Sequence, residues 1–397
     1  MNKLKTESSQ HTTIILCTVA LYAACFQAQM PVQPYLLKSM SQNSVSDFGK
    51  FRSYVAGLQF IGGLVAGSLI DRWGAKSILA LSLMASAVSY FLSGMATDMS
   101  MLYLAQIPTL AQHAVMASRS YFSLSVEEGS NRAKMLGYVT SAYAVGLICG
   151  PFIGGILSDS GLQVAAMVAA VVSLFNTIFV IMFLVTPKHE TSSLLQPAKV
   201  QKGNYSALLG NSRILYGLVM KSFFVFAINL FQSGLQIVLP ERFGITAKET
   251  GYFLSFIGVI ALIASMLMVK PFYEWYGQRT VLLATNLTLF VCFMIFMVID
   301  SPIQLIILAI PHTAANVVFA AISTQSLTSL VLPEQQGILT AVDMGCGSLI
   351  RIITPQLSAF LFSTFGFWSL GATSAALVGI SFVLALVGAA VPLRKKE

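Results

Sequence analysis

Six ionisable side chains lie inside long apolar stretches of this sequence, where a charge is costly and needs a reason. They comprise three bases, one acid and two histidines: Arg119, Lys221, Arg351, Asp343, His113 and His312. A histidine changes its charge near neutral pH, so both histidines are candidates for proton coupling. The alternative for each is a buried ring that bonds a backbone carbonyl.

The single embedded acid needs a partner from another segment. Asp343 and Arg351 are eight residues apart, about 12 Å along a helix, which is too far for a direct pair. Arg119 lies about two turns from the end of its own segment, at a depth similar to that of Asp343. We therefore expect Arg119 to interact with Asp343 near an inner gate; the alternative is that Arg119 extends to the lipid headgroups.

Membrane helices are the elements that must position these residues. Hydrophobic residues make up 56% of the 397 and charged residues only 10%, whereas a soluble domain carries about 25% charged residues. Apolar segments of roughly 20 residues recur along the chain, as a bilayer core requires of a helix. Twelve such segments begin near Thr13, Ser53, Ser77, Met101, Lys134, Leu162, Ile214, Gly251, Thr280, Pro302, Gly337 and Phe367.

The basic residues fix the orientation of these helices. Most of the 23 lysines and arginines fall on one side of the membrane if the N-terminus is inside, so both termini are expected in the cytosol. The formal charge of +8 does not indicate a nucleic-acid partner, because these residues do not cluster on one soluble face.

The sequence repeats at an interval of about 203 residues, which indicates two pseudo-symmetric halves. Gly74 matches Gly277, Pro108 matches Pro311 and Leu136 matches Leu339. We expect an N-terminal six-helix half over 1–186, a cytosolic linker over 187–213 and a C-terminal half over 214–397. Two similar halves with the site between them are typical of alternating access.

A charged turn between the second and third segments carries the most specific motif. Its fixed positions are Gly67, Leu69, Asp71, Arg72, Gly74 and Lys76. This pattern resembles the loop signature of the major facilitator superfamily, in which the loop is taken to steady the outward-facing state. We expect Asp71 to lie at a helix N-terminus and Arg72 to pair with Glu127 or Glu128, with a purely topological role for the charges as the alternative.

The fifth segment carries a second motif of small residues around a proline. Its members are Gly146, Gly150, Pro151, Gly154 and Gly155. Glycines four residues apart let helix backbones approach closely, and the proline bends the helix. The run resembles the signature of superfamily antiporters, which implies exchange; plain tight packing is the alternative.

Finer features resemble the organic-cation-transporter-like branch around member 18 of solute carrier family 22. They include Pro108, His113, the run from Glu127 to Gly137, the run from Gly251 to Phe256, and the run from Leu349 to Pro355. Gln106 stands near the place where drug antiporters carry an arginine, which departs from their pattern. The superfamily fold implies a cavity lined by segments one, four, seven and ten, with uncharged candidates Gln27, Gln106, Gln232 and Asn316.

The sequence therefore predicts a secondary transporter of a small organic solute, exchanging organic cations or drugs for protons. The excess of embedded bases supports the alternative of an organic anion such as a carboxylate, and a non-transporting membrane sensor or scaffold is the alternative of another class. No phosphate-binding glycine loop, nucleophile, metal-ligand cluster or cofactor motif is found, so we expect no enzyme. We expect a monomer in the plasma membrane or, from the dileucine-like run Glu190 to Leu195, in an endolysosomal or vacuolar membrane.

Overall fold

The computed structural model describes residues 2–41, 43–125, 130–186, 210–332 and 335–388, and within these ranges the long elements are helices and no strand occurs. Eleven stretches in them are long and apolar enough to cross a membrane. Together with one interrupted segment, they account for the twelve predicted spans.

Contacts divide the chain into two compact units. Unit 1 comprises residues 1–44, 54–200 and 245–258, and unit 2 comprises residues 45–53, 201–244 and 259–397. The main boundary between the units therefore lies near residue 200. Residues 45–53 group with unit 2 and residues 245–258 group with unit 1. The predicted linker lies mostly outside the described residues, and the division into 1–186 and 214–397 stays a prediction.

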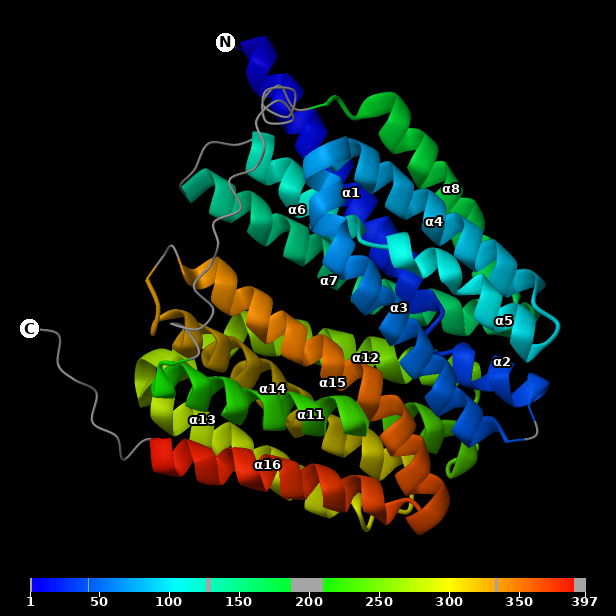
Figure 1. Ribbon diagram of the computed structural model, residues 1–397. Helices are drawn as coiled ribbons and strands as arrows, with labels where there is room; N and C mark the ends of the chain where they lie inside the picture. The colour runs from blue at the N-terminus through cyan, green and yellow to red at the C-terminus, as the bar shows by residue number, and fades with distance from the viewer. Residues whose placement is uncertain (1, 42, 126–129, 187–209, 333–334, 389–397) are drawn as a thin grey trace, which may run out of the picture. The chain divides into compact units, whose positions relative to one another are not determined.

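The helices before the linker are the following: α1 (Asn2–Ala28), α2 (Gln33–Met40), α3 (Ser44–Trp73), α4 (Ala75–Met95), α5 (Met99–Ala105), η1 (Ile107–Ala111), α6 (Ala114–Ser125), α7 (Ser130–Leu157), η2 (Ser158–Ser160) and α8 (Val164–Phe183). Within unit 1, α1 packs along α7 and α8, and α4 packs along α8 and α6 (Figure 1).

The helices after the linker are α11 (Ser212–Glu241), α12 (Ala247–Leu267), α13 (Val269–Phe296), α14 (Pro302–Thr328), α15 (Gln336–Phe365) and α16 (Trp368–Gly388). Within unit 2, α11 packs along α15 and α16, while α13 packs along α14 and α16. Ser301 begins α14 with a reciprocal capping box to Gln304, which satisfies two backbone donors at the helix start.

The fourth predicted span is not a continuous helix. It is divided into α5, η1 and α6 around Pro108 and His113. Proline lacks a backbone donor and clashes with the preceding turn, so the helix cannot run through it unchanged. Some of the remaining donors bond locally, as when the main-chain N–H of Gln112 donates to the Thr109 carbonyl at 3.1 Å.

The duplicated turns have the same backbone conformation, as the repeat predicts. Gly74 has φ 84° and ψ 155°, and Gly277 has φ 73° and ψ 161°. A positive φ is a region that glycine adopts readily and other residues avoid. Gly277 therefore interrupts α13 in the way that Gly74 separates α3 from α4.

Candidate functional site

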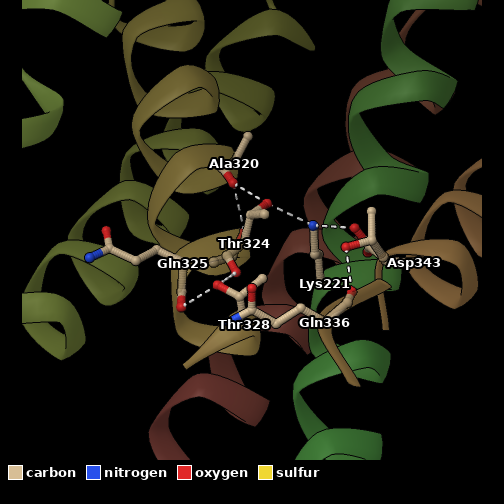
Figure 2. Close-up of polar contacts among 9 residues, drawn as sticks. Lys221, Ala320, Thr324, Gln325, Thr328, Gln336 and Asp343 are labelled. Carbon is tan, nitrogen blue, oxygen red and sulfur yellow. Dashed lines mark hydrogen bonds and ion pairs between the residues drawn. The ribbon is translucent and has the colours of Figure 1, made fainter. Parts of the chain in front are cut away.

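An ion pair with a hydroxyl partner lies at the end of unit 2 where α11 and α15 begin and α14 ends. The ammonium of Lys221 is 2.6 Å from Oδ2 of Asp343 and donates to Oγ1 of Thr324 at 2.8 Å (Figure 2). The three residues come from α11, α15 and α14, so the site forms only when these helices pack together. Both charges lie within predicted membrane spans.

Local helix geometry prepares Thr324 for this contact. Its hydroxyl donates to the carbonyl of Ala320, one turn earlier in α14, at 2.8 Å. The hydroxyl proton is thereby used within the helix, and an oxygen lone pair remains to accept from Lys221. The threonine therefore supplies a fixed acceptor for the ammonium.

Burial makes the pair sensitive to the charge of either member. The side chain of Lys221 is 10% exposed and that of Asp343 is 27% exposed. An ammonium held away from water needs its counter-charge, and protonation of Asp343 would remove that counter-charge. The carboxylate is also the more exposed member of the pair.

The expected pairing of Arg119 with Asp343 would join the two units and stays a prediction; within each unit both residues have another partner. Asp343 is held by Lys221 within unit 2, and Arg119 donates through Nη2 to Oγ1 of Thr140 at 3.3 Å within unit 1. The similar depth of Arg119 and Asp343 in their spans suggested this pairing. In the structure, α11 places the ammonium of Lys221 beside the Asp343 carboxylate. Thr140 is 203 residues before Asp343, so both bases contact equivalent positions of the two halves.

Arg351 lies on α15 two turns beyond Asp343, and its side chain is exposed. Its Nη2 donates to the hydroxyl of Ser348 at 3.1 Å, and that hydroxyl donates to the carbonyl of Met344. The guanidinium is thus bound to its own helix by one weak neutral partner. The predicted separation of Arg351 from Asp343 holds, since the acid is bound to Lys221.

The two histidines lie in different surroundings. His312 is buried against the rings of Phe231 and Phe293, with ring centroids 4.9 Å and 5.4 Å away. The main-chain N–H of His113 donates to Oγ of Ser82 at 3.2 Å, and its ring lies against Gly62. Within the described part of the chain, Nε2 has no hydrogen-bond partner in either ring. Their role in proton coupling stays a prediction.

The uncharged candidates are dispersed over both units. Gln106 is buried and donates through Nε2 to Oγ of Ser93 at 3.0 Å. Gln27 on α1 and Asn316 on α14 are half-buried, and Gln232 on α11 is exposed. Gln27 and Gln106 belong to unit 1 and the other two to unit 2, and the cavity that the four were expected to line stays a prediction.

Sequence reasoning missed Thr324 and Gln112. Thr324 belongs to a cluster of polar residues near the end of an otherwise apolar helix, a signal that could have found it. Gln112 is buried in unit 1, and neither atom of its amide has a partner among the described residues. Its main-chain carbonyl accepts from the hydroxyl of Tyr22 at 3.2 Å. The interruption of the helix at residues 106–113 places Gln112 beside Tyr22.

The charged turn is only partly within the described residues. Asp71 and Arg72 are exposed at the end of α3, and Lys76 donates to the carbonyl of Ile181 on α8 at 3.2 Å. Glu127 and Glu128, the expected partners of Arg72, lie outside the described residues. The proposed gate contact of this turn therefore stays a prediction.

The glycine motif of α7 allows a close approach to α1. A Cβ at Gly146, Gly150 or Gly154 would lie 2.1–2.6 Å from its nearest atom of α1; the shortest distance is to the Ala28 carbonyl oxygen from position 154. These three glycines therefore face α1, a helix of the same unit. Gly155 faces α12, where its Cβ would lie 3.0 Å from Cα of Gly251.

Further contacts join the start of α12 to the rest of unit 1. Oγ of Ser255 donates to the carbonyl of Ile148 at 2.7 Å, and Lys248 pairs with Asp159 at 2.5 Å. Tyr35 contacts Oγ1 of Thr250 at 2.7 Å. Pro151 and Gly155 of α7 thus face the start of α12, where these polar contacts also lie.

Comparisons with known proteins agree on one family. The sequence profile described as Major Facilitator Superfamily matches residues 15–273. Solute carrier family 22 member 18 of Mus musculus is 25% identical over 369 residues, which cover 89% of this chain and 90% of that protein. Tetracycline resistance protein, class H, of Pasteurella multocida is 25% identical over 355 residues, covering 88% of each chain.

Solved structures share the fold. The human organic anion transporter MFSD10 (TETRAN) has a TM-score of 0.69 at 18% identity, with 95% of this chain and 99% of that chain covered. The nucleoside transporter NupG has a TM-score of 0.71 at 14% identity, with 96% and 98% covered. At such identities these likenesses establish the fold alone.

Proposed function

The chain belongs to the Major Facilitator Superfamily of transporters, and we propose that it moves a small organic solute by alternating access, coupled to protons at Asp343. The observation that carries the proposal is the pair of Lys221 with Asp343, half-buried and bonded to Thr324. A charge inside a membrane span marks an ion or substrate pathway by default.

Protonation supplies a physical means of coupling. While Asp343 is charged, it holds Lys221 and so joins α11 to α15. When Asp343 takes up a proton, the Coulombic attraction between these helices is lost and Lys221 is left as a buried cation. The proton therefore changes the relative stability of two arrangements of unit 2, which is what alternating access requires.

Exchange of a drug-like solute is the form of coupling supported by the relatives. Proteins of similar sequence are named tetracycline and multidrug resistance proteins, and the glycine motif around Pro151 resembles that of antiporters. An organic cation would compete with protons for Asp343, giving exchange directly. An organic anion is the second candidate, because the described spans hold more bases than acids.

Localisation follows from the same reading. The chain is a multi-pass membrane protein, and the distribution of lysine and arginine supports both termini in the cytosol. The plasma membrane and an endolysosomal or vacuolar membrane are both proposed, since the dileucine-like run lies outside the described residues.

The alternative of a sensor or scaffold without transport predicts no solute movement in the following experiment.

Reconstitution with a trapped pH indicator tests the coupling. The solute is the one that most raises the unfolding temperature of the purified protein, from a panel of organic cations and anions. In wild-type liposomes a solute gradient is expected to change the internal pH. Asp343→Asn is expected to abolish this change while solute-for-solute exchange continues.

The matched control is Asp300→Asn. Asp300 also pairs with a base, Arg242 at 2.7 Å, but its side chain is 85% exposed. This variant is expected to move protons like the wild type. Proton movement that persists unchanged in Asp343→Asn would refute the coupling role of Asp343, and the direction of proton movement decides between exchange and cotransport.

A further inference from the structure

Arg351 lies in the middle of a membrane span. It follows the start of α15 at Gln336 by 15 residues and precedes the end at Phe365 by 14. At 1.5 Å per residue it is ~22 Å from one end of the helix and ~21 Å from the other. The bilayer core is ~30 Å thick, so a helix centred in it places Arg351 near the midplane.

At this depth the side chain cannot reach water at the headgroups. Each interface is ~15 Å from the midplane, farther than three methylenes and a guanidinium extend. Arg119 differs, because it is only six residues before the end of α6 at Ser125. The exposed guanidinium of Arg351 therefore needs water or a counter-charge at the level of the membrane centre itself.

Within the described part of unit 2, no carboxylate pairs with it. The acid nearest along its own helix, Asp343, is held by Lys221 at 2.6 Å. Within the part of unit 2 that the structure describes, the hydrogen bond of Arg351 goes to the neutral hydroxyl of Ser348. The charges of Lys221 and Asp343 balance each other. The positive charge of Arg351 on α15 is not balanced by a described residue of unit 2.

The row of α15 that carries Arg351 is open one turn before it. Asp343, Gly347 and Arg351 follow one another at four-residue spacing and so lie in one row on α15. A Cβ at Gly347 would meet nothing within 4 Å. Pro355, four residues later, cannot donate to the carbonyl of Arg351, so a backbone acceptor is released at the same level.

We propose that Arg351 binds the anionic group of the transported solute, which makes the solute an organic carboxylate or sulfonate. The inference rests on the proposed transport function and favours its second candidate, the organic anion, over the organic cation. A planar guanidinium binds a carboxylate or sulfonate through two parallel hydrogen bonds. The ligand supplies the counter-charge that the described part of unit 2 lacks, and the proposed protonation site, Asp343, lies about 12 Å nearer the start of α15.

Probes that differ only in charge test the substrate class. We choose benzenesulfonate and benzoate, with benzyltrimethylammonium and benzyl alcohol as cationic and neutral counterparts. The measurement is the unfolding temperature of the full-length protein in detergent across probe concentrations. The anions are expected to raise it in a saturable way, and the other two are not.

Two variants assign the effect to Arg351. Arg351→Gln removes the charge and is expected to weaken anion binding about ten- to hundredfold, the range for a charge-assisted hydrogen bond. Arg351→Lys keeps the charge without the paired geometry and is expected to bind with intermediate affinity. The control Arg213→Gln makes the same charge change at the exposed start of α11 and is expected to bind like the wild type.

The outcomes separate this inference from the proposed function. Stabilisation by benzyltrimethylammonium, or equal anion binding by wild type and Arg351→Gln, overturns the anion site while leaving proton-coupled transport intact. The absence of any shift with either anion overturns it as well. Should Arg351→Gln fail to fold, Arg351→Lys against wild type carries the test, because a merely structural charge would give both the same affinity.

Discussion

Breaking the pair of Lys221 with Asp343 in steps is the sharpest test of the site. Lys221→Met keeps an unbranched side chain of similar length but removes the charge, and Asp343→Asn keeps the shape and removes the other charge. The two single variants and the double variant complete a thermodynamic cycle. The cycle isolates the interaction energy between the two side chains from the cost of each change alone.

The exposed fractions of the side chains set the expected magnitudes. Removing one member of a fully buried pair costs about 3–5 kcal/mol. Lys221→Met strands a carboxylate that is 27% exposed and partly hydrated, so we expect a loss of about 2 kcal/mol. Asp343→Asn strands an ammonium that is only 10% exposed, so we expect about 3 kcal/mol. The double variant should lie within about 1 kcal/mol of wild type.

Unfolding by SDS in mixed micelles, followed by circular dichroism, gives the free energies. A matched cycle on Arg242 and Asp300 serves as the control, because their atoms are 2.7 Å apart but their side chains are 36% and 85% exposed. Exposed pairs contribute about 0.2–1 kcal/mol. Equal coupling energies in the two cycles, or a double variant no more stable than Asp343→Asn, would refute the reasoning from burial.

Three further predictions concern the glycines and the charged turn. Gly154→Leu is expected to destabilise the protein by about 1–3 kcal/mol in SDS unfolding, because even its Cβ would lie 2.1 Å from the Ala28 carbonyl oxygen. The control Gly137→Leu on the same helix has open space and should change the stability little. Gly277→Ala should cost about 1–2 kcal/mol in the same assay, since φ is 73° there; no loss would mean that the turn relaxes. Asp71→Asn should slow solute uptake into liposomes with an unchanged unfolding temperature, and uptake at the wild-type rate would count against the gate.

The fold was predictable because its main signals are local. Long apolar segments specify membrane helices, and the interval of 203 residues between Gly74 and Gly277 specifies the duplicated turn, which the shared positive φ matches. The interruption around Pro108 was less accessible to this reasoning. A proline within a helix can bend it or end it, and the tertiary contacts of the freed backbone groups decide which.

The site was predictable in composition and not in pairing. Hydropathy identified Arg119, Lys221, Asp343 and Arg351 as embedded charges, because their cost depends on depth alone. Which base meets the acid depends on how helices distant in sequence rotate against each other, and depth does not specify that. Thr324 was missed because a threonine in an apolar helix usually bonds its own backbone, and the sequence does not show that its oxygen also accepts from Lys221.

The repeat itself holds the information that would have resolved the pairing. At the same interval of 203 residues, Lys221 corresponds to Thr18 and Asp343 corresponds to Thr140. Both members of the pair therefore occupy positions at which the first half carries threonine. A lone lysine or a lone aspartate introduced there would be a buried uncompensated charge, whereas the two together compensate each other. Two residues that both depart from an internal repeat are therefore candidates for a direct contact. Here they place the carboxyl group of Asp343 in unit 2 where unit 1 has the hydroxyl group of Thr140.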